Sequence, residues 1–214
     1  FIINLTGTDD SGNPVNLSAT TDANGNYSFS VAPGIYTVTE VCPAGAPWRQ
    51  SFPGPLTSEA ACGANGYAIT LTSGQVDSNN DFGNFQSASK SGLKFLDINA
   101  DGVRDIDGLD NVAGNADDEV GLAGFIINLT GTDGSGNVVN LTATTDVNGN
   151  YSFSVAPGIY TVTEVCPAGV GWRQSFPGPL TSVATCGANG YAITLTSGQV
   201  DANNDFGNFQ SASK

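Results

Sequence analysis

The stretch TTDVNGNYSFSVAPGIYTVTEV, residues 144–165, decides the fold class. Two sets of residues alternate with serine or threonine along it: Tyr151, Phe153 and Val155, then Tyr160, Val162 and Glu164. A period of two indicates half-buried β-strands, and Asn148-Gly149 and Pro157-Gly158 are typical of the turns between strands. We therefore predict strands over residues 151–155 and 159–166, with Glu164 on the face that points to the core.

The same period of two continues on both sides of this stretch, and no segment has helical spacing with caps. Further candidate strands are residues 93–96, 125–130, 138–144, 191–196 and 206–210. Seven short strands with polar turns between them predict an all-β fold, a β-sandwich of immunoglobulin-like build.

An internal repeat organises the chain. Residues 1–90 and 125–214 align at an offset of 124 and differ at nine positions, whereas residues 91–124 occur once. We predict tandem sandwiches: an incomplete repeat at 1–90, which lacks a leading strand and acidic loop, and a complete repeat at 91–214, whose body is 125–214. Residues 86–92 are the expected linker, and the chain is expected to be a window from a longer tandem array.

Composition excludes several functions. The 214 residues contain 20 acidic and 6 basic side chains, a net charge of -14, and neither His nor Met. A protein that binds nucleic acid needs clustered Lys and Arg, so no nucleic-acid partner is expected. Most enzymes use His as a base or a metal ligand, so we predict that the chain is not an enzyme. No apolar run is long enough to span a membrane.

An acidic segment, residues 91–124, holds eight of the 20 acidic residues. Its core resembles the first part of an EF-hand calcium loop, because oxygen ligands stand at positions one, three, five and nine and Gly102 at six. These ligands are Asp97, Asn99, Asp101 and Asp105, and the carbonyl of Val103 falls at position seven. Position twelve is Gly108, where an EF-hand has a bidentate acid.

Later residues of the acidic segment can complete one calcium site and build a second. The further candidate ligands are Asp107, Asp110, Asn111, Asn115, Asp117, Asp118 and Glu119. Oxygen ligands without His or thiolate select Ca²⁺ over transition metals, so one or more calcium ions are expected in each complete repeat. The alternative is a solvated acidic loop that only keeps the protein soluble.

The four cysteines fall as one pair in each copy, Cys42 with Cys62 and Cys166 with Cys186. A disulfide within each copy is the most economical pairing, and cross-links between neighbouring copies are the alternative. Disulfides imply an oxidising, extracytoplasmic setting, so the protein is expected outside the cell or at its surface.

A family resemblance follows from an ordered series of motifs: SGLKFLDINADGVRD (91–105), DDEVGLAGFIINL (117–129), the stretch 144–165 and DFGN (205–208). Together they resemble the B-type repeat of serine-aspartate repeat surface proteins, within the Cna protein B-type superfamily. The resemblance implies a Cna-B or transthyretin-like sandwich that is stiffened by calcium outside a cell wall. Residues 107–116 are an insertion relative to that pattern.

The same resemblance implies a self-catalysed isopeptide bond between Lys94 and Asn208, with Glu164 as the proton carrier. The alternatives are a buried Lys–Glu ion pair, or a Glu that is hydrogen-bonded to the backbone. Alternation leaves the inward orientation of Lys94 undecided, since Leu93 and Phe95 flank it. The incomplete copy has Glu40 and Asn84 but no equivalent Lys.

Two functions follow from the sequence. The first is a structural module of an extracellular fibre, stalk or surface filament, whose partners are neighbouring copies of the same repeat. The second is an adhesin module, in which Trp172 and Arg173 or a strand edge contact a protein or glycan. In the other interpretation of Trp172, its ring caps the end of the core. Edge-to-edge pairing between arrays, which would give bundled filaments, is a third possibility that fits either function.

Overall fold

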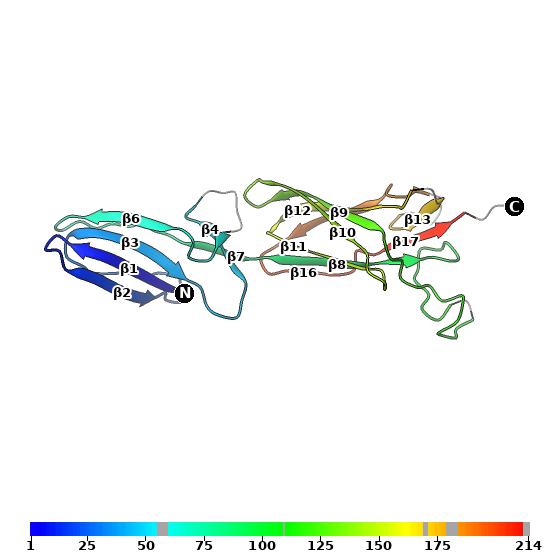
Figure 1. Ribbon diagram of the computed structural model, residues 1–214, viewed down its shortest axis with the longest axis horizontal. Coiled ribbons are helices and arrows are strands. Elements are labelled where there is room, and N and C mark those ends of the chain that lie inside the picture. The colour runs from blue at the N-terminus through cyan, green and yellow to red at the C-terminus, as the bar shows by residue number, and fades with distance from the viewer. Residues whose placement is uncertain (55–59, 109, 169–170, 179–183, 212–214) are drawn as a thin grey trace. The chain divides into compact units, whose positions relative to one another are not determined.

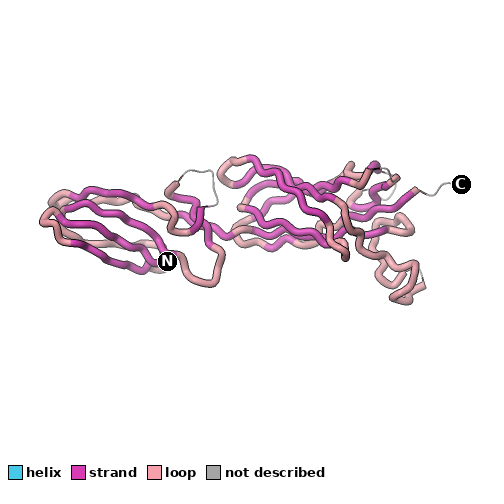
Figure 2. The backbone as a smooth tube through the Cα atoms, in the orientation of Figure 1, coloured by secondary structure: helices cyan, strands magenta, loops and turns pink. Residues whose placement is uncertain are grey.

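The computed structural model describes residues 1–214 except 55–59, 109, 169–170, 179–183 and 212–214. Strands, turns and loops make up this described part, which contains no helix (Figure 2). Accordingly, none of the described residues forms a helix long and apolar enough to cross a membrane. The prediction of an all-β chain is confirmed.

Two compact units divide the chain: unit 1 is Phe1–Ser87 and unit 2 is Ala88–Lys214. In unit 2 one sheet has the order β10-β9-β12-β15. Its strands are β9 (Ile126–Asp133), β10 (Val138–Thr144), β12 (Gly158–Val165) and β15 (Gly190–Leu195). The other sheet has the order β11-β8-β17-β13-β14, with β16 paired to β8. Its strands are β8 (Ala88–Leu96), β11 (Asn150–Val155), β13 (Trp172–Phe176), β14 (Ala184–Thr185), β16 (Val200–Asp201) and β17 (Phe206–Gln210).

The core of unit 2 lies between these two sheets, which Figure 1 shows one above the other. One sheet contributes Ile127, Leu129, Tyr160, Val162, Ile193 and Leu195. The other contributes Ala88, Tyr151, Phe153, Val155 and Phe206. Inward side chains from two facing sheets are the defining feature of a β-sandwich, so unit 2 is one.

Strand β8 lies inside its sheet. It pairs antiparallel with β11 on one side, where Tyr151 lies opposite Gly92. On the other side it pairs parallel with β16 and β17, where Phe206 lies opposite Lys94. The first strand of unit 2 is therefore hydrogen-bonded directly to its last strand.

Unit 1 repeats most of this plan. One sheet has the order β2-β1-β3-β6 and the other the order β5-β4-β7. The strands are β1 (Ile2–Asp9), β2 (Pro14–Thr20), β3 (Gly34–Val41), β4 (Trp48–Phe52), β5 (Ala60–Ala61), β6 (Gly66–Leu71) and β7 (Gly83–Gln86). Residues 26–31 and 76–77, which correspond to β11 and β16, are not strands in unit 1.

The boundary between the units corrects one sequence prediction. Residues 86–92 were expected as a linker and the first strand of the complete repeat at 93–96, but β8 begins at Ala88. Ala88 and Lys90 are fully buried in unit 2, because Ala88 packs in the core and Lys90 is paired with Asp201. Residues 87–90, SASK, are polar and have the composition of a linker. Their composition does not show that Lys90 is buried, because its burial depends on its acidic partner Asp201.

The other predicted strands of unit 2 match β9, β10, β11, β12, β15 and β17 with small shifts at their ends. The short strands β13, β14 and β16 were missed. Strands β14 and β16 are only two residues long, which is too short to show an alternation. Strand β13 contains a register shift between Gln174 and Phe176, which interrupts its alternation.

Candidate functional site

Three strands bring Lys94, Glu164 and Asn208 together. Lys94 lies on β8 and Asn208 on β17, which pair in parallel, and Glu164 points down from β12 in the facing sheet. All three side chains are buried, with at most 2% of each residue exposed. The expectation that Glu164 points into the core is confirmed, and Lys94 also points inward.

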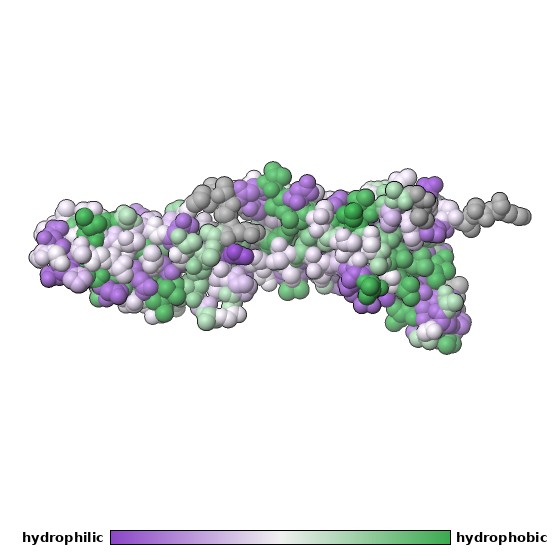
Figure 3. Space-filling model, in the orientation of Figure 1, coloured by the Kyte–Doolittle hydropathy of each residue, from purple (hydrophilic) through white to green (hydrophobic). Residues whose placement is uncertain are grey.

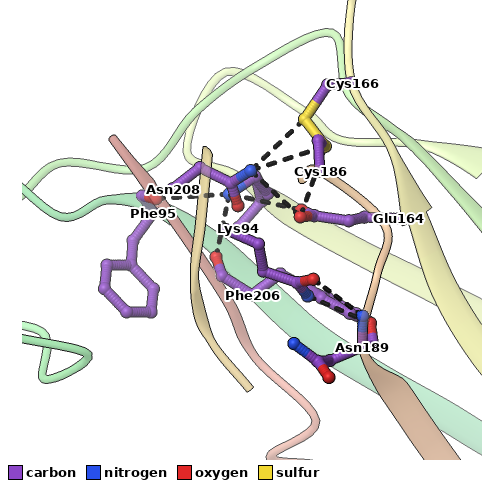
Figure 4. Close-up of a disulfide and its surroundings, with 9 residues drawn as sticks. Lys94, Phe95, Glu164, Cys166, Cys186, Asn189, Phe206 and Asn208 are labelled. Carbon is purple, nitrogen blue, oxygen red and sulfur yellow. Dashed lines mark hydrogen bonds and ion pairs between the residues drawn. A yellow bond between two sulfur atoms is a disulfide. The ribbon is translucent and has the colours of Figure 1, made fainter. Parts of the chain in front are cut away.

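The contacts in this cluster connect the amine, the carboxyl and the amide (Figure 4). Lys94 Nζ donates hydrogen bonds to Oδ1 of Asn208 and, at 3.1 Å, to the main-chain oxygen of Phe206. It also lies 3.5 Å from Oε2 of Glu164. Nδ2 of Asn208 donates to Oε1 of Glu164 at 2.9 Å. Glu164 therefore has one oxygen beside the amine and the other beside the amide nitrogen.

Apolar groups shield the cluster from water. The ring of Phe125, itself 1% exposed, has its centroid 4.7 Å from Nζ of Lys94. The disulfide between Cys166 and Cys186 covers the amide, since Nδ2 of Asn208 lies 3.2 and 3.5 Å from the two sulfur atoms. A dry site of this kind disfavours charged groups.

Burial shifts both titrating groups toward their neutral forms. It lowers the pKa of the Lys94 amine to about 8, although the charge of Glu164 opposes this shift. Burial likewise raises the pKa of the Glu164 carboxyl, against the opposing effects of Lys94 and of the hydrogen bond from Asn208. A neutral amine is a nucleophile and a neutral carboxylic acid is a proton donor. The cluster can therefore support attack of the amine on the amide.

Unit 1 has the same cluster without a lysine. Glu40 is 3% exposed, and its Oε1 accepts a hydrogen bond from Nδ2 of Asn84 at 2.8 Å. The other oxygen, Oε2, has no hydrogen-bond partner among the residues that the structure describes. Burial raises the pKa of this carboxyl. Oε2 of Glu40 thus corresponds to the oxygen of Glu164 that lies 3.5 Å from Nζ of Lys94 in unit 2.

The disulfides join Cys42 to Cys62 and Cys166 to Cys186, each with a Cα–Cα distance of 5.9 Å. Each pair lies within one unit, so the cysteines make no cross-link between units. All four cysteines are used, so none is left as a thiolate that could hold a metal beside Glu40 or Glu164.

The first half of the acidic segment forms a tight loop. Oδ1 and Oδ2 of the fully buried Asp97 accept hydrogen bonds from the main-chain nitrogens of Asp101 and Gly102. Glu119, 2% exposed, closes the loop by accepting from the main-chain nitrogens of Ile98 and Asp105. The pKa of Glu119 is raised, first by burial and then by the charges of Asp97 and Asp105.

Other carboxylates of the segment are used within the loop. Asp110 accepts from the side chain of Asn115, and Asp118 from the main-chain nitrogens of Gly114 and Asn115. Asp107 and Val103 are exposed. The segment projects below β8 and β17 in Figure 1, and Figure 3 shows hydrophilic and hydrophobic side chains together on it.

The candidate ligands of the acidic segment are of the chemical type that calcium prefers, because each of them offers an oxygen atom. Oδ1 of Asp118 is buried with no hydrogen-bond partner in the described part of the chain, so it is available to a cation. The described carboxylates of this segment do not, however, converge in any group of three whose oxygens lie within 4.8 Å of one another. Nδ2 of Asn99 instead donates to Asp101 at 3.0 Å and to Asp105 at 3.5 Å.

Trp172 is half-buried on β13, and its ring makes an edge contact with Phe125 at a centroid distance of 5.2 Å. Arg173 lies opposite Thr185 and Phe209 in the sheet and is also partly buried. This geometry favours the interpretation of Trp172 as a cap on the core. Part of the loop around it, residues 169–170 and 179–183, lies outside the described residues.

Lys90 is a buried residue that the sequence did not reveal. Its Nζ lies 3.3 Å from Oδ1 of Asp201 on β16 and 5.8 Å from the ring centroid of Tyr151 on β11. Lys90 and Lys94 thus hold β8 at two points. The sequence does show an acidic residue, Asp201, in a turn-rich segment, and this residue is the partner of Lys90. No pattern in the sequence, however, pairs position 201 with position 90.

Comparisons with known proteins find distant structures only. No family model matches the chain, and no curated protein does. Among solved structures, the Bacillus anthracis TIE protein aligns with 98% of this chain and 30% of its own, at 13% identity and a TM-score of 0.37. The shaft pilin SpaA of Lactobacillus rhamnosus GG aligns over 100% and 85%, at 13% identity and a TM-score of 0.35. A streptococcal ancillary pilin aligns over 99% and 57%, at 16% identity and a TM-score of 0.32.

This chain thus spans about a third of the length of the TIE chain that it matches. All three TM-scores are below 0.5, so the functional argument rests on the residues of this chain.

Proposed function

We propose that the chain is a structural, load-bearing module of an extracellular repeat protein, and that Lys94 and Asn208 cross-link unit 2 by an isopeptide bond. The observation that carries this proposal is the buried contact of Lys94 Nζ with the Asn208 side chain, with Glu164 touching both. Two disulfides within the units support an extracellular setting.

The reaction needs no cofactor or oxidant. The neutral amine of Lys94 attacks Cγ of Asn208, so a bond forms between Nζ and Cγ and the bond from Cγ to Nδ2 breaks. Glu164 accepts a proton from the attacking nitrogen through Oε2, and a carboxyl proton passes to the departing nitrogen near Oε1. Ammonia leaves, and one amide replaces another. The fixed geometry supplies the high effective concentration that such a step requires.

The position of the bond explains a mechanical role. Strand β8 begins unit 2 and β17 ends it, and the two strands are neighbours in one sheet. A pulling force on the chain enters through one strand and leaves through the other. A bond between Lys94 and Asn208 carries that force directly, so the residues between them bear no tension.

Single-molecule pulling on the oxidised full chain tests this function. We expect unit 2 of the unmodified protein to release no length from the residues between 94 and 208. The variant Glu164→Gln, which has no proton carrier, is expected to release that length at low force, except for the loop that the disulfide between Cys166 and Cys186 keeps closed. The matched control is Glu40→Gln in unit 1, which is expected to behave like the unmodified protein. Equal length gains in Glu164→Gln and the unmodified protein would refute the proposal.

Calcium binding by the acidic segment is the second part of the proposal. The ion would be held by Asp97, Asn99, Asp101, the carbonyl of Val103 and Asp105, and its charge would offset the repulsion between carboxylates. Titration calorimetry of calcium into chelator-treated protein is expected to give saturable binding that Asp101→Asn with Asp105→Asn abolishes. Absence of binding in the unmodified protein would leave the segment as a solvated acidic loop.

A further inference from the structure

The disulfide of unit 2 joins its two sheets at the cluster of Lys94, Glu164 and Asn208 (Figure 4). Cys166 directly follows β12, the strand of Glu164, and Cys186 directly follows β14. Strand β14 pairs with β13, and β13 pairs with β17, the strand of Asn208. The disulfide therefore ties the sheet that holds the carboxyl to the sheet that holds the amide.

Both sulfur atoms lie against the amide group that the proposed reaction breaks. Nδ2 of Asn208 lies 3.2 Å from Sγ of Cys166 and 3.5 Å from Sγ of Cys186. A disulfide sulfur carries no proton, so it offers only a weak acceptor. The NH2 group of the amide therefore fits against the sulfur atoms, whereas its oxygen would face two acceptors there. This orientation leaves Oδ1 of Asn208 for the Lys94 amine.

The same disulfide holds the carboxyl of Glu164. Sγ of Cys186 lies 3.4 Å from Oε1 of Glu164. The next residue, Gly187, has a φ of 76°, and a Cβ built on it would meet the main-chain oxygen of Glu164 at 2.6 Å. Glycine is required for so close an approach. Gln174 fixes the end of this turn, because its side chain exchanges hydrogen bonds of 2.9 and 3.0 Å with the main chain of Asn189.

The disulfide also lies between the cluster and solvent. Cys166 and Cys186 are half-buried, whereas Glu164 is 2% and Asn208 0% exposed. A water molecule in place of the sulfur atoms would hydrogen-bond to Nδ2 of Asn208 and to Oε1 of Glu164, and so compete with their mutual contact. Water also favours the charged forms of the amine and the carboxyl, which do not react. The sulfur atoms exclude it.

Unit 1 makes the same contacts. Nδ2 of Asn84 lies 3.7 Å from Sγ of Cys42 and 3.8 Å from Sγ of Cys62, and it donates to Oε1 of Glu40 at 2.8 Å. A Cβ built on Gly63 would meet the main-chain oxygen of Glu40 at 2.5 Å. The contact of disulfide, carboxyl and amide is therefore a regular feature of this repeat.

We propose that the disulfide between Cys166 and Cys186 is a positioning group that accelerates the cross-link, by orienting the Asn208 amide and excluding water from Glu164. This role rests on the proposed function, because it sets the rate of the same step. The disulfide forms first: two thiols give two protons and two electrons to a disulfide oxidant, which becomes two thiols. Lys94 then attacks and ammonia leaves, and the sulfur atoms are unchanged by that step. Cross-linking is therefore faster in an oxidising setting.

A time course of intact mass tests the role of the disulfide. The full chain is synthesised in a reducing cell-free system, and half of it then receives glutathione disulfide. We expect loss of one ammonia to be at least about tenfold faster in the oxidised half, because small displacements of reacting groups slow such reactions strongly. Both halves are expected to reach the same final mass, because the pairing of β8 with β17 still holds Lys94 beside Asn208. Equal rates would overturn the positioning role.

Two pairs of substitutions separate positioning from loop closure. Neither Cys166→Val with Cys186→Val nor Cys166→Ser with Cys186→Ser can close the loop, but only valine keeps an apolar cover. We expect the valine pair to cross-link faster than the serine pair, with folding checked by the fluorescence of Trp172 in a Trp48→Phe background. Equal rates in folded variants would assign the disulfide to loop closure alone. The control, Cys42→Ser with Cys62→Ser in unit 1, is expected to leave the rate unchanged.

A chain that cannot cross-link reports the position of the amide without the reaction. In Lys94→Met, the side-chain amide protons of Asn208 are expected to exchange with solvent more slowly in the oxidised than in the reduced protein, measured by NMR. Equal exchange would overturn the positioning role even if the rates of ammonia loss differ. An oxidised unmodified chain that never loses ammonia would overturn the proposed function as well, whereas equal ammonia loss with and without the disulfide overturns the positioning role alone.

Discussion

Residues 1–87 of unit 1 and 125–211 of unit 2 differ at only nine positions, yet their equivalent side chains differ in burial. Tyr151 and Phe206 are buried, whereas Tyr27 and Phe82 are not. The difference coincides with β8, which covers the first pair and has no counterpart over the second. The burial of a residue in this fold is therefore set by the strand that covers it. The reactive lysine belongs to that same strand.

The largest difference between the units is expected from removing the proton carrier. Glu164→Gln prevents the cross-link, and the free energy of unfolding of unit 2 is expected to fall by about 5 kcal/mol, because a bond across 114 residues no longer restricts the unfolded chain. Denaturant unfolding followed by tryptophan fluorescence measures this, with Trp48→Phe as background so that only unit 2 reports. Glu40→Gln, measured through Trp48 in a Trp172→Phe background, is the matched control. A fall of the same size in unit 1 would contradict the assignment of this stability to the cross-link.

The disulfides are expected to affect the two units equally. Each closes a loop of 20 residues, so replacing either cysteine pair with serine is expected to lower the free energy of unfolding of its own unit by about 3 kcal/mol. The same two single-tryptophan backgrounds measure each unit separately. A much smaller loss in one unit than in the other would contradict loop closure as the source of the stabilisation, because the two loops are equal in length.

The pH dependence of an uncross-linked unit 2 is the next effect in size. In Asn208→Ala the unfolded chain keeps the Lys94 proton up to its ordinary pKa of 10.5, whereas the folded pKa is about 8. The unfolded state then binds more protons in this window, so stability rises with pH. We expect a gain of about 2 kcal/mol between about pH 8 and about pH 9.5. The added substitution Lys94→Met is expected to remove the rise, and a flat profile without it would contradict the burial of the amine.

The smallest effect concerns Glu40. Burial raises the pKa of this carboxyl, so the folded state keeps its proton to higher pH than the unfolded chain does. Unit 1 therefore loses stability as pH rises from 4.5 through the raised pKa, and the loss is complete once the pH exceeds that raised pKa. Glu40→Gln is expected to flatten this part of the profile, measured through Trp48. An unchanged profile in the variant would assign the pH dependence to other groups.

Much of the fold follows from the sequence because alternation and turn residues are local signals. They predicted the strands around Tyr160 and the inward orientation of Glu164. The start of β8 did not follow, because Lys90 is buried by pairing with Asp201, a contact across more than a hundred residues. The contact of Lys94 with Asn208 likewise depends on the parallel pairing of β8 and β17, which no local pattern encodes. The calcium ligands remain a prediction from spacing.

The intact mass of the full chain, taken after reduction, is the most direct test of the central claim. The account predicts a mass lower than that of the sequence by one ammonia, and peptide mapping that places Lys94 and Asn208 in one linked fragment. Glu164→Gln is expected to have the full mass, and Glu40→Gln to show the same loss as the unmodified chain. An unmodified chain with the full mass of its sequence would contradict the cross-link and the load-bearing role built on it.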